Sequence, residues 1–310
     1  MKISICVINK NSEKTLEKSL RSVLDQIDSR FEIVVIDEST DSSPQILKRL
    51  ESEYPEKLKS FYYGTQPLKS IGAARNMSIT KATGSYCIMH IDCDDIWHPY
   101  ISYFADVFLE IEKFMKKDFL LAGHQINMAR RDFLLSVGPY QDIKHGEDRD
   151  LWMRLAKSGQ YMPLDHVAFF KRLPLDNKTN KVKAIKRTYW SVGDEIRGGK
   201  KFKDLLSEVF KSFTHLTLAM KLSRLVFFPI AKIKFKNLTQ IDKSLYFENE
   251  SEWNSYKKRN FGTFSNIAPI WGFPKTLDFL SSKSARAIFE NKRSDKKIED
   301  IFNKEENRDK

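Results

Sequence analysis

Short apolar runs alternate with helical patterns over the first 125 residues of the chain. Residues 3–8, 32–36 and 86–91 are nearly continuous in apolar side chains, which is typical of strands covered on both faces. Residues 58–63 alternate between apolar and polar and predict a further strand. Between these runs apolar residues recur at helical spacing, and Gly84 ends the last of the predicted helices. The βαβαβαβ order predicts an α/β fold with a mostly parallel sheet and helices on both faces.

Three of the predicted strands end in polar clusters. The clusters are Asn9-Lys10-Asn11, Asp37-Glu38-Ser39-Thr40-Asp41 and Asp92-Cys93-Asp94-Asp95. In open α/β sheets, ligands bind beyond the carboxyl ends of the strands. We therefore expect the functional site at this edge of the sheet.

The pattern changes along the rest of the chain. A strand is predicted near residues 124–129, and a helix that opens at residues 145–150 follows it. Beyond residue 171 the alternation of strands and helices disappears. We predict a catalytic domain over residues 1–170 and a basic, aromatic-rich, mainly helical region over 171–290. The highly charged residues 291–310 predict a frayed tail.

The net charge of +12 is unevenly distributed. Residues 1–170 carry about −2 and residues 171–310 about +14, which predicts an anionic partner for the second half. A phospholipid surface, a phosphate-bearing acceptor and nucleic acid all fit this charge. We do not expect nucleic acid, because no recognised nucleic-acid motif accompanies the charge.

Residues 209–241 sharpen this expectation. They mix six cations with large apolar residues and contain no acid. Lys221 and Arg224 interrupt the apolar run and Pro229 breaks a helix, so we predict that the segment lies in a membrane interface without spanning it. The alternative is that its aromatic residues pack on the catalytic domain and its lysines are only solvated.

The cysteines and the N-terminus bear on location. Cys6, Cys87 and Cys93 are an odd number and imply no disulfide framework, which favours a reducing compartment. The apolar run at residues 3–8 is too short for a secretion signal, and no uncharged apolar run approaches the roughly 20 residues of a spanning helix. We expect a cytoplasmic protein that is peripheral on the cytoplasmic face of the membrane.

Asp92, Asp94 and Asp95 form the strongest chemical signal. Three carboxylates within four residues repel one another unless a cation or solvent relieves them. Mn²⁺ or Mg²⁺ held by one or two carboxylates, with a diphosphate completing its coordination, would relieve them. The alternative is a solvated acidic turn that caps a helix. The apolar strand in front of the cluster favours the metal site.

Four motifs, in this order, resemble those of family 2 glycosyltransferases, which have the GT-A fold. The resemblance covers roughly residues 1–170. The motifs are Ile36-Asp37-Glu38-Ser39-Thr40-Asp41, Gly72-Ala73-Ala74-Arg75-Asn76, Ile91-Asp92-Cys93-Asp94-Asp95, and Gly146-Glu147-Asp148 followed by Leu151-Trp152-Met153-Arg154-Leu155. They are similar to the family's Val-Asp-Asp-Gly-Ser-Thr-Asp turn, Gly-x-x-x-Ala-Arg-Asn helix, Asp-x-Asp motif and Glu-Asp motif. Glu38 replaces the second Asp of the turn, whose glycine is missing.

The resemblance implies a metal-dependent enzyme that uses a nucleotide-diphospho-sugar. The metal is assigned to Asp92, Asp94 and Asp95, with Asp95 supporting the ion or the sugar. Donor binding is assigned to Asn9, Asp37, Glu38, Arg75 and Asp92. Asp37 is placed to accept a hydrogen bond from the base, and Arg75 to reach the diphosphate. A turn residue at Asp37 and a structural ion pair at Arg75 are the alternatives.

The Glu-Asp motif implies the catalytic residues Asp148 and Glu147. Asp148 is our choice for the general base that takes the proton of the acceptor hydroxyl, with Glu147 beside it. The alternative is that both acids only interact with the helix dipole. One displacement with one base implies inversion at the sugar carbon.

Other functions remain as alternatives to a non-processive, hexosyltransferase-like enzyme. The Gln-x-x-Arg-Trp signature of processive synthases is absent, so one sugar is expected to pass to a hydroxyl of a glycan or lipid-linked glycan. A sugar nucleotidyltransferase would show a glycine-rich loop after the first strand, where this chain has none. An inactive transferase scaffold that binds a membrane or nucleic acid is the alternative outside enzymes. The histidines His90, His124, His145 and His166 show no metal-ligand spacing and are predicted to be structural.

Overall fold

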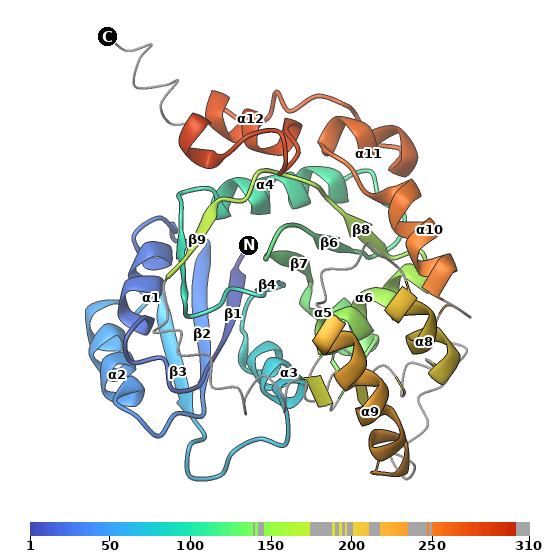
Figure 1. The fold of residues 1–310 in the computed structure, drawn as a ribbon. Helices are drawn as coiled ribbons and strands as arrows, with labels where there is room; N and C mark the ends of the chain where they lie inside the picture. Colours follow the sequence, from blue (N-terminus) through green and yellow to red (C-terminus); the bar gives the residue numbers. More distant parts are fainter. Residues whose placement is uncertain are drawn as a thin grey trace.

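A seven-stranded sheet forms the centre of the molecule (Figure 1). The computed structural model describes residues 1–138, 140–141, 146–173, 188–189, 192–193, 196, 201–210, 218–234, 247 and 250–301. The strand order is β3-β2-β1-β4-β7-β6-β8. The strands are β1 (Ile3–Asn9), β2 (Phe31–Asp37), β3 (Leu58–Tyr62), β4 (Tyr86–Met89), β6 (Leu120–Ala122), β7 (Asn127–Arg130) and β8 (Tyr161–Pro163).

The first four strands of the sheet are parallel to one another. β6 and β8 are also parallel, whereas β7 runs antiparallel to both β4 and β6. The register of β1 and β2 places Asn9 opposite Asp37 at their carboxyl ends. The predicted mostly parallel sheet is confirmed, and the first and second polar clusters of the sequence meet at one edge because parallel strands end on the same side.

Helices cover both faces of this sheet. The helices of the first 160 residues are α1 (Leu16–Leu24), α2 (Ser43–Glu53), α3 (Ile71–Lys81), α4 (Ile101–Glu112), α5 (Arg131–Ser136) and α6 (Glu147–Lys157). Side chains of α1, α2 and α4 share one core with Ile3, Ile5 and Val7 of β1. Side chains of α3, α5 and α6 share the other core with Cys6, which alternates to the opposite face of β1. This arrangement confirms the predicted α/β class with helices on both faces of the sheet, and the described C-terminal elements are helical.

The last helices complete the same two cores. They are α10 (Glu250–Asn260), α11 (Phe264–Trp271) and α12 (Lys283–Glu290). Trp253 and Tyr256 of α10 join the core that contains α3, α5 and α6. Phe264 and Phe289 join the core that contains α1, α2 and α4. Residues 250–301 therefore do not form a domain separate from residues 1–170, because their apolar side chains have no core of their own.

The C-terminal tail is ordered further than its charge predicted. Ile298 and Ile301 are buried in the core that contains α4. The prediction of a frayed tail is therefore wrong up to residue 301, where two apolar residues among many charges anchor the chain. Residues 302–310 lie outside the described part.

Two further helices, α8 (Phe202–Phe210) and α9 (Leu218–Lys234), pack against each other. Leu205 of α8 and Phe228 and Ala231 of α9 form a small cluster of their own with Val192. Much of the basic segment 209–241 falls on α9, its first two residues end α8, and residues 211–217 and 235–241 lie outside the described part. None of the helices in the described part has the length and apolar character needed to cross a membrane.

A two-stranded antiparallel sheet was missed by the sequence pattern. It joins β5 (Asp95–Trp97) to β9 (Phe170–Arg172), with Asp95 opposite Arg172. Strands of three residues are too short to show a periodicity. This small sheet matters because it carries residue 172 to the acidic cluster.

Candidate active site at the carboxyl edge of the sheet

The ends of β1 and β2 are joined by a buried polar network. The Asn9 Nδ2 donates to Asp37 Oδ1 over 2.9 Å and to Ser39 Oγ over 3.0 Å. The Ser39 hydroxyl donates to the same Asp37 oxygen over 2.6 Å. Asp37 Oδ2 and Asn9 Oδ1 are buried and accept no hydrogen bond within the described residues. Since buried acceptors are normally satisfied, these two oxygens are suited to a ligand that brings N–H or O–H groups.

Glu38 has a structural partner beside this network. Its Oε1 accepts a hydrogen bond of 2.5 Å from the backbone N–H of Leu68, in the connection between β3 and α3. The side chain therefore fastens that connection to the end of β2. Its assignment to donor binding stays a prediction, and the contact to Leu68 shows what the carboxylate does in the protein alone.

Asp92, Asp94 and Asp95 converge after β4. One carboxylate oxygen from each lies within 4.8 Å of the others. Burial raises the pKa of Asp92 and of Asp95, and repulsion from Asp94 adds to both effects. Gln125 donates from Nε2 to Asp92 Oδ2 over 2.7 Å and so orients that carboxylate. Three carboxylate oxygens at this separation suit a hard divalent cation such as Mg²⁺ or Mn²⁺.

Arg172 reaches the same cluster from β9. Its Nε lies 3.0 Å from Asp95 Oδ1, and its Nη2 lies 3.3 Å from Asp95 Oδ2. Further contacts are 3.4 Å from Nη2 to Asp92 and 3.8 Å from Nε to Asp94. The guanidinium therefore partly neutralises all three carboxylates. Sequence reasoning missed Arg172, because no motif contains it and only the pairing of β5 with β9 brings it to the cluster.

The three acids of the cluster are not equivalent. The Asp95 side chain is fully buried and both its oxygens face Arg172, whereas the side chains of Asp92 and Asp94 are 30% and 23% exposed. A two-pronged contact of this kind is the geometry that arginine prefers with a carboxylate. In this structure Asp95 holds Arg172, and Asp92 and Asp94 offer the more accessible oxygens.

Arg75 connects the acidic cluster to the Glu-Asp motif. Its Nε donates to Glu147 Oε1 over 2.9 Å, and its guanidinium lies 5.8 Å from the centre of the Tyr140 ring. Burial raises the pKa of Glu147, and the positive charge of Arg75 opposes this. The same charge counteracts the raised pKa of Asp92. Arg75 therefore binds Glu147 while its charge also acts on Asp92, and its assignment to donor binding stays a prediction.

Glu147 and Asp148 open α6 with different surroundings. Both belong to the first turn, after Gly146 at φ 79°. Glu147 is buried against Arg75, but Asp148 is half-buried and accepts a hydrogen bond of 2.6 Å from the N–H of Arg149. Asp148 therefore has the more exposed carboxylate of the two. Glu147 holds Arg75, and the assignment of both acids to catalysis stays a prediction.

Unusual backbone conformations gather around the polar network and the acidic cluster. Within the described residues, the non-glycine residues with positive φ are Asn11, His90 and Gln125, at 55°, 72° and 61°. Asn11 accepts from the Thr40 N–H, and Gln125 binds Asp92. The His90 ring lies 2.8 Å from the Tyr140 hydroxyl. Such conformations are costly and concentrate at functional sites, which agrees with this edge being the working face.

The histidines behave as structural residues where they are described. Burial lowers the pKa of His166 to about 3, and its Nε2 accepts from the backbone N–H of His124. Burial followed by the charge of Arg75 lowers the pKa of His90 well below its usual value. His145 lies outside the described residues. Cys6, Cys87 and Cys93 are buried free thiols.

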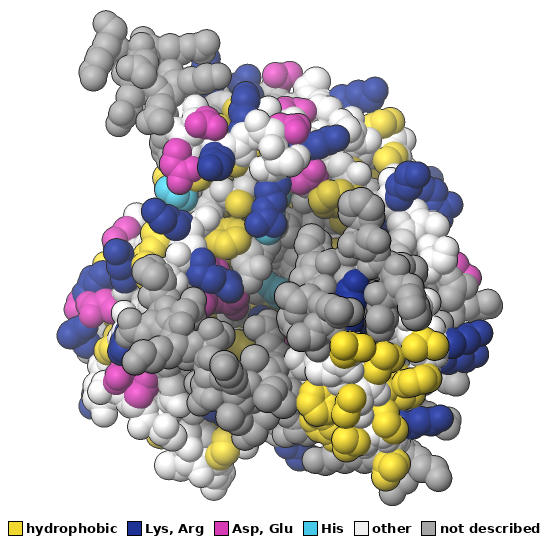
Figure 2. Space-filling model, viewed as in Figure 1, with side chains coloured by type: hydrophobic (Ala, Val, Ile, Leu, Met, Phe, Trp, Pro, Cys, Tyr) yellow, Lys and Arg dark blue, Asp and Glu magenta, His cyan; other side chains and the backbone are white. Residues whose placement is uncertain are grey.

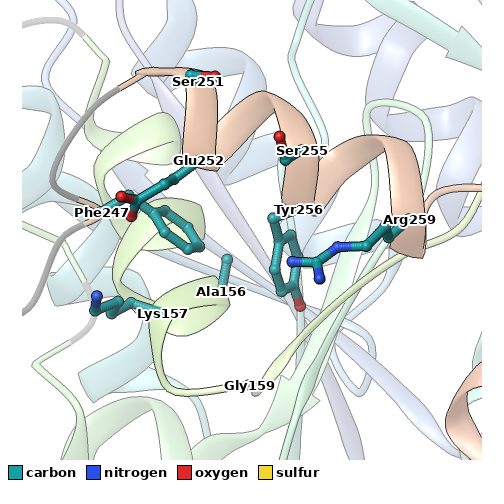
Figure 3. A pocket seen from close by; sticks show the side chains of 9 residues that line it. All are labelled: Ala156, Lys157, Gly159, Phe247, Ser251, Glu252, Ser255, Tyr256 and Arg259. Atoms are coloured by element: carbon teal, nitrogen blue, oxygen red, sulfur yellow. The ribbon is translucent and has the colours of Figure 1, made fainter.

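A separate pocket of about 450 Å³ lies at the far end of α6 (Figure 3). Lys157 and Gly159 line one side, and Ser255, Tyr256 and Arg259 of α10 line the other. An 11-residue helix is about 16 Å long, so this pocket is well removed from Asp148 at the start of α6. The pocket is not part of the polar edge of the sheet.

Comparisons with known proteins show which family the first part of the chain resembles. The family described as Glycosyl transferase family 2 matches residues 4–132. An uncharacterized glycosyltransferase of Nostoc sp. strain PCC 7120 is 36% identical over 101 residues, covering 32% of this chain and 30% of that protein. Glycosyltransferase GlyA of Streptococcus pneumoniae is 32% identical over 174 residues, covering 56% of this chain and 21% of that protein. S. aureus TarS has a TM-score of 0.47 at 18% identity, over 76% of this chain and 44% of that chain.

The chain spans less than two thirds of the length of these two curated relatives. The matched range includes the polar network at Asp37, Arg75 and the acidic cluster, whereas the Glu-Asp motif and Arg172 lie beyond it. Residues 4–132 therefore form a domain that matches the family 2 glycosyltransferases.

Proposed function

We propose that the protein is an inverting, metal-dependent glycosyltransferase. It moves one sugar from a nucleotide-diphospho-sugar to an acceptor hydroxyl. The observation that carries this proposal is the junction at Arg75, whose charge acts on Asp92 of the acidic cluster and on Glu147 beside Asp148. Together with the 2.9 Å contact from Arg75 Nε to Glu147 Oε1, this supports a site in which the acidic cluster handles the diphosphate and Asp148 takes the proton.

The acidic cluster suits Mn²⁺ or Mg²⁺. Asp92 and Asp94 would hold the ion, because their oxygens are the more accessible ones, and Asp95 would act through Arg172. A bound divalent cation supplies charge neutralisation for a departing diphosphate. Arg172 would also help to neutralise the charge of the diphosphate, since its guanidinium already lies among the carboxylates.

The network at the end of β1 and β2 suits the base of the donor. Asp37 Oδ2 and Asn9 Oδ1 are buried acceptors of this network that lack a hydrogen bond within the described residues. A nucleobase carries N–H groups that would satisfy them, and the cost of leaving such acceptors unpaired is about 1–3 kcal/mol each. The hydrogen bonds from Asn9 and Ser39 hold Asp37 in place for that contact.

Asp148 would act as the general base. The acceptor hydroxyl gives its proton to an Asp148 carboxylate oxygen while its own oxygen bonds to the sugar carbon. The bond from that carbon to the diphosphate oxygen breaks, and its electron pair leaves with the diphosphate. A single displacement from the face opposite the leaving group inverts the sugar carbon. The acceptor we propose is a glycan or lipid-linked glycan at the cytoplasmic face of a membrane.

The direct test is the release of a nucleoside diphosphate. The protein is incubated with a panel of nucleotide-diphospho-sugars and Mn²⁺ or Mg²⁺, with and without a chelator. We expect at least one donor to be consumed, slowly by water and faster when a saccharide acceptor is added, and we expect the chelator to stop both. No consumption of any donor with either metal would instead support an inactive scaffold.

The contact between Arg172 and the acidic cluster leads to a prediction on stability. Arg172→Ala is expected to lower the melting temperature at pH 7 without metal, because the fully buried Asp95 loses its partner, a cost of about 1–3 kcal/mol. Added Mn²⁺ should then raise the melting temperature of the variant more than that of the wild type, since no guanidinium competes for the carboxylates.

Arg30→Ala is the matched control for this prediction. Arg30 also contacts two carboxylates, those of Asp28 and Asp106, but far from the acidic cluster in the sequence and on the surface. The melting temperature of the Arg30→Ala variant should respond to Mn²⁺ as that of the wild type does. Equal Mn²⁺ responses of Arg172→Ala and the wild type would show that Arg172 and the ion do not share the cluster.

A further inference from the structure

An apolar stripe on α9 faces away from the rest of the protein. Leu222, Val226, Ile230 and Ile233 follow one another at spacings of four, four and three residues, so they lie on one side of the helix. All four are exposed, and the exposed fraction of Ile233 reaches 79%. Helices of globular proteins normally turn such a stripe toward the core.

The buried side of α9 is unusual in the opposite sense. Phe228 and Ala231 pack there against Leu205 of α8. Lys221 and Arg224 are buried as well. The helix therefore turns two cations inward and its aliphatic stripe outward, which is the reverse of what water favours. An exposed surface of this kind marks an interaction site.

The apolar surface continues onto α8. Phe202 and Leu206 are exposed, and the ring of Phe202 lies 5.5 Å from that of Phe228. We call the six exposed residues the α8–α9 patch: Phe202, Leu206, Leu222, Val226, Ile230 and Ile233. Figure 2 shows hydrophobic side chains gathered over these two helices, with Lys and Arg side chains at their border.

The charges around the patch identify the kind of partner. Lys201 and Lys203 are exposed at the start of α8, and Lys232 is exposed beside the stripe on α9. The sequence of α9 contains four cations and no acid. An apolar stripe with cations at its border fits a surface that offers acyl chains below and negative charge above, as an anionic phospholipid bilayer does.

We infer that the α8–α9 patch is the face by which the protein lies on an anionic phospholipid membrane. The aliphatic side chains enter the boundary between headgroups and acyl chains, and the bordering lysines meet the lipid phosphates. The inference rests on the proposed function and deepens it, because it names the surface that would meet a membrane-borne acceptor.

Vesicle binding by matched variants tests the inference. The full chain is sedimented with phosphatidylglycerol–phosphatidylcholine vesicles and with pure phosphatidylcholine vesicles, at low and high salt. Ile230→Glu changes a patch residue that is 52% exposed, and Ile270→Glu changes an isoleucine of α11 that is 51% exposed. Both substitutions are on the surface, so both variants are expected to fold.

We expect the wild type to bind the anionic vesicles and to be released as salt rises. Ile230→Glu should bind about tenfold less or worse, because it places a carboxylate in the acyl boundary, whereas Ile270→Glu should bind as the wild type does. Lys232→Glu should weaken binding mainly at low salt. Absence of wild-type binding, or equal loss in the two isoleucine variants, would overturn the inference.

A second copy of the chain is the competing occupant of the patch. Light scattering over a range of protein concentrations tests it, and a dimer that Ile230→Glu dissolves would overturn membrane docking in favour of self-association. The outcome is separate from the proposed activity, because vesicle binding is measured without a donor. An enzyme that consumes a nucleotide-sugar but ignores vesicles would leave the function standing and remove only this inference.

Discussion

Asp94→Ala is expected to lower turnover by about 10³-fold or more, which corresponds to roughly 4 kcal/mol of transition-state stabilisation. Asp94 carries one of the two accessible carboxylates of the acidic cluster. Its loss removes a ligand for the divalent cation that would neutralise the leaving diphosphate. Turnover of a nucleotide-sugar at saturating Mn²⁺, together with Mn²⁺ affinity measured by calorimetry, checks the expectation.

Asp94 is the most informative acid of the three. Asp92 accepts a hydrogen bond from Gln125 and Asp95 holds Arg172, so their removal would also disturb the local structure. Asp132→Ala is the control, because that side chain is 98% exposed on α5 and lies outside the cluster. A folded Asp94→Ala variant with turnover and Mn²⁺ affinity near those of the wild type would show that the metal assignment is wrong.

Asp148→Asn is expected to lower turnover by about 10²-fold or more while donor and metal binding stay intact. The amide keeps the size and hydrogen-bonding reach of the carboxylate but cannot take the proton of the acceptor hydroxyl. The half-buried position of Asp148, beside the buried Glu147, is the reason to expect the effect at this residue. Turnover with a saccharide acceptor and donor affinity by thermal shift are the measurements.

Asp132→Asn is the matched control for the helix-dipole alternative. Asp132 lies in the first turn of α5 as Asp148 does in that of α6, so both substitutions remove a similar interaction with a helix dipole. That interaction is worth about 0.3–1 kcal/mol and affects stability rather than turnover. If Asp148→Asn only lowered the melting temperature, as Asp132→Asn should, Asp148 would be a capping acid and not the base.

The main sheet was predictable because the hydrophobic pattern of each of its first four strands is visible in that strand's own residues. Ile3, Ile5 and Val7 and the intervening Cys6 are apolar on both faces, as a strand between two helical layers requires. The three-residue strands β5, β6, β8 and β9 were not predicted. Their residues pair with partners far along the chain, and nothing in so short a segment records that pairing.

The sequence pattern did not show which later residues complete the two cores of the sheet. Composition separates a basic second half from an acidic first half, but composition does not say which apolar residues complete a core. Phe264 and Phe289 join the core that contains α4, and Ile298 and Ile301 reach the same core from a highly charged segment. Burial of a few apolar side chains outweighed the average polarity around them.

The residues of the candidate site divide in the same way. The motifs placed Asp37, Asp92 and Asp148 at strand ends or at a helix start, and the structure puts them at those positions. Their distinct surroundings were not readable. Nothing local indicates that Glu147 is buried against Arg75, or that Gln125, in a left-handed conformation, orients Asp92.

The resemblance to family 2 glycosyltransferases, the parallel sheet and the edge on which its acids gather could all be read from the sequence. These follow from periodicity and from short motifs, because neighbouring residues are enough to specify a strand and the turn after it. The tertiary structure alone decided how the acids differ. Arg172 is 77 residues from Asp95, and only the pairing of β5 with β9 joins their charges. It also decided that α9 turns its apolar stripe outward, because which face of a helix is covered depends on what packs against it.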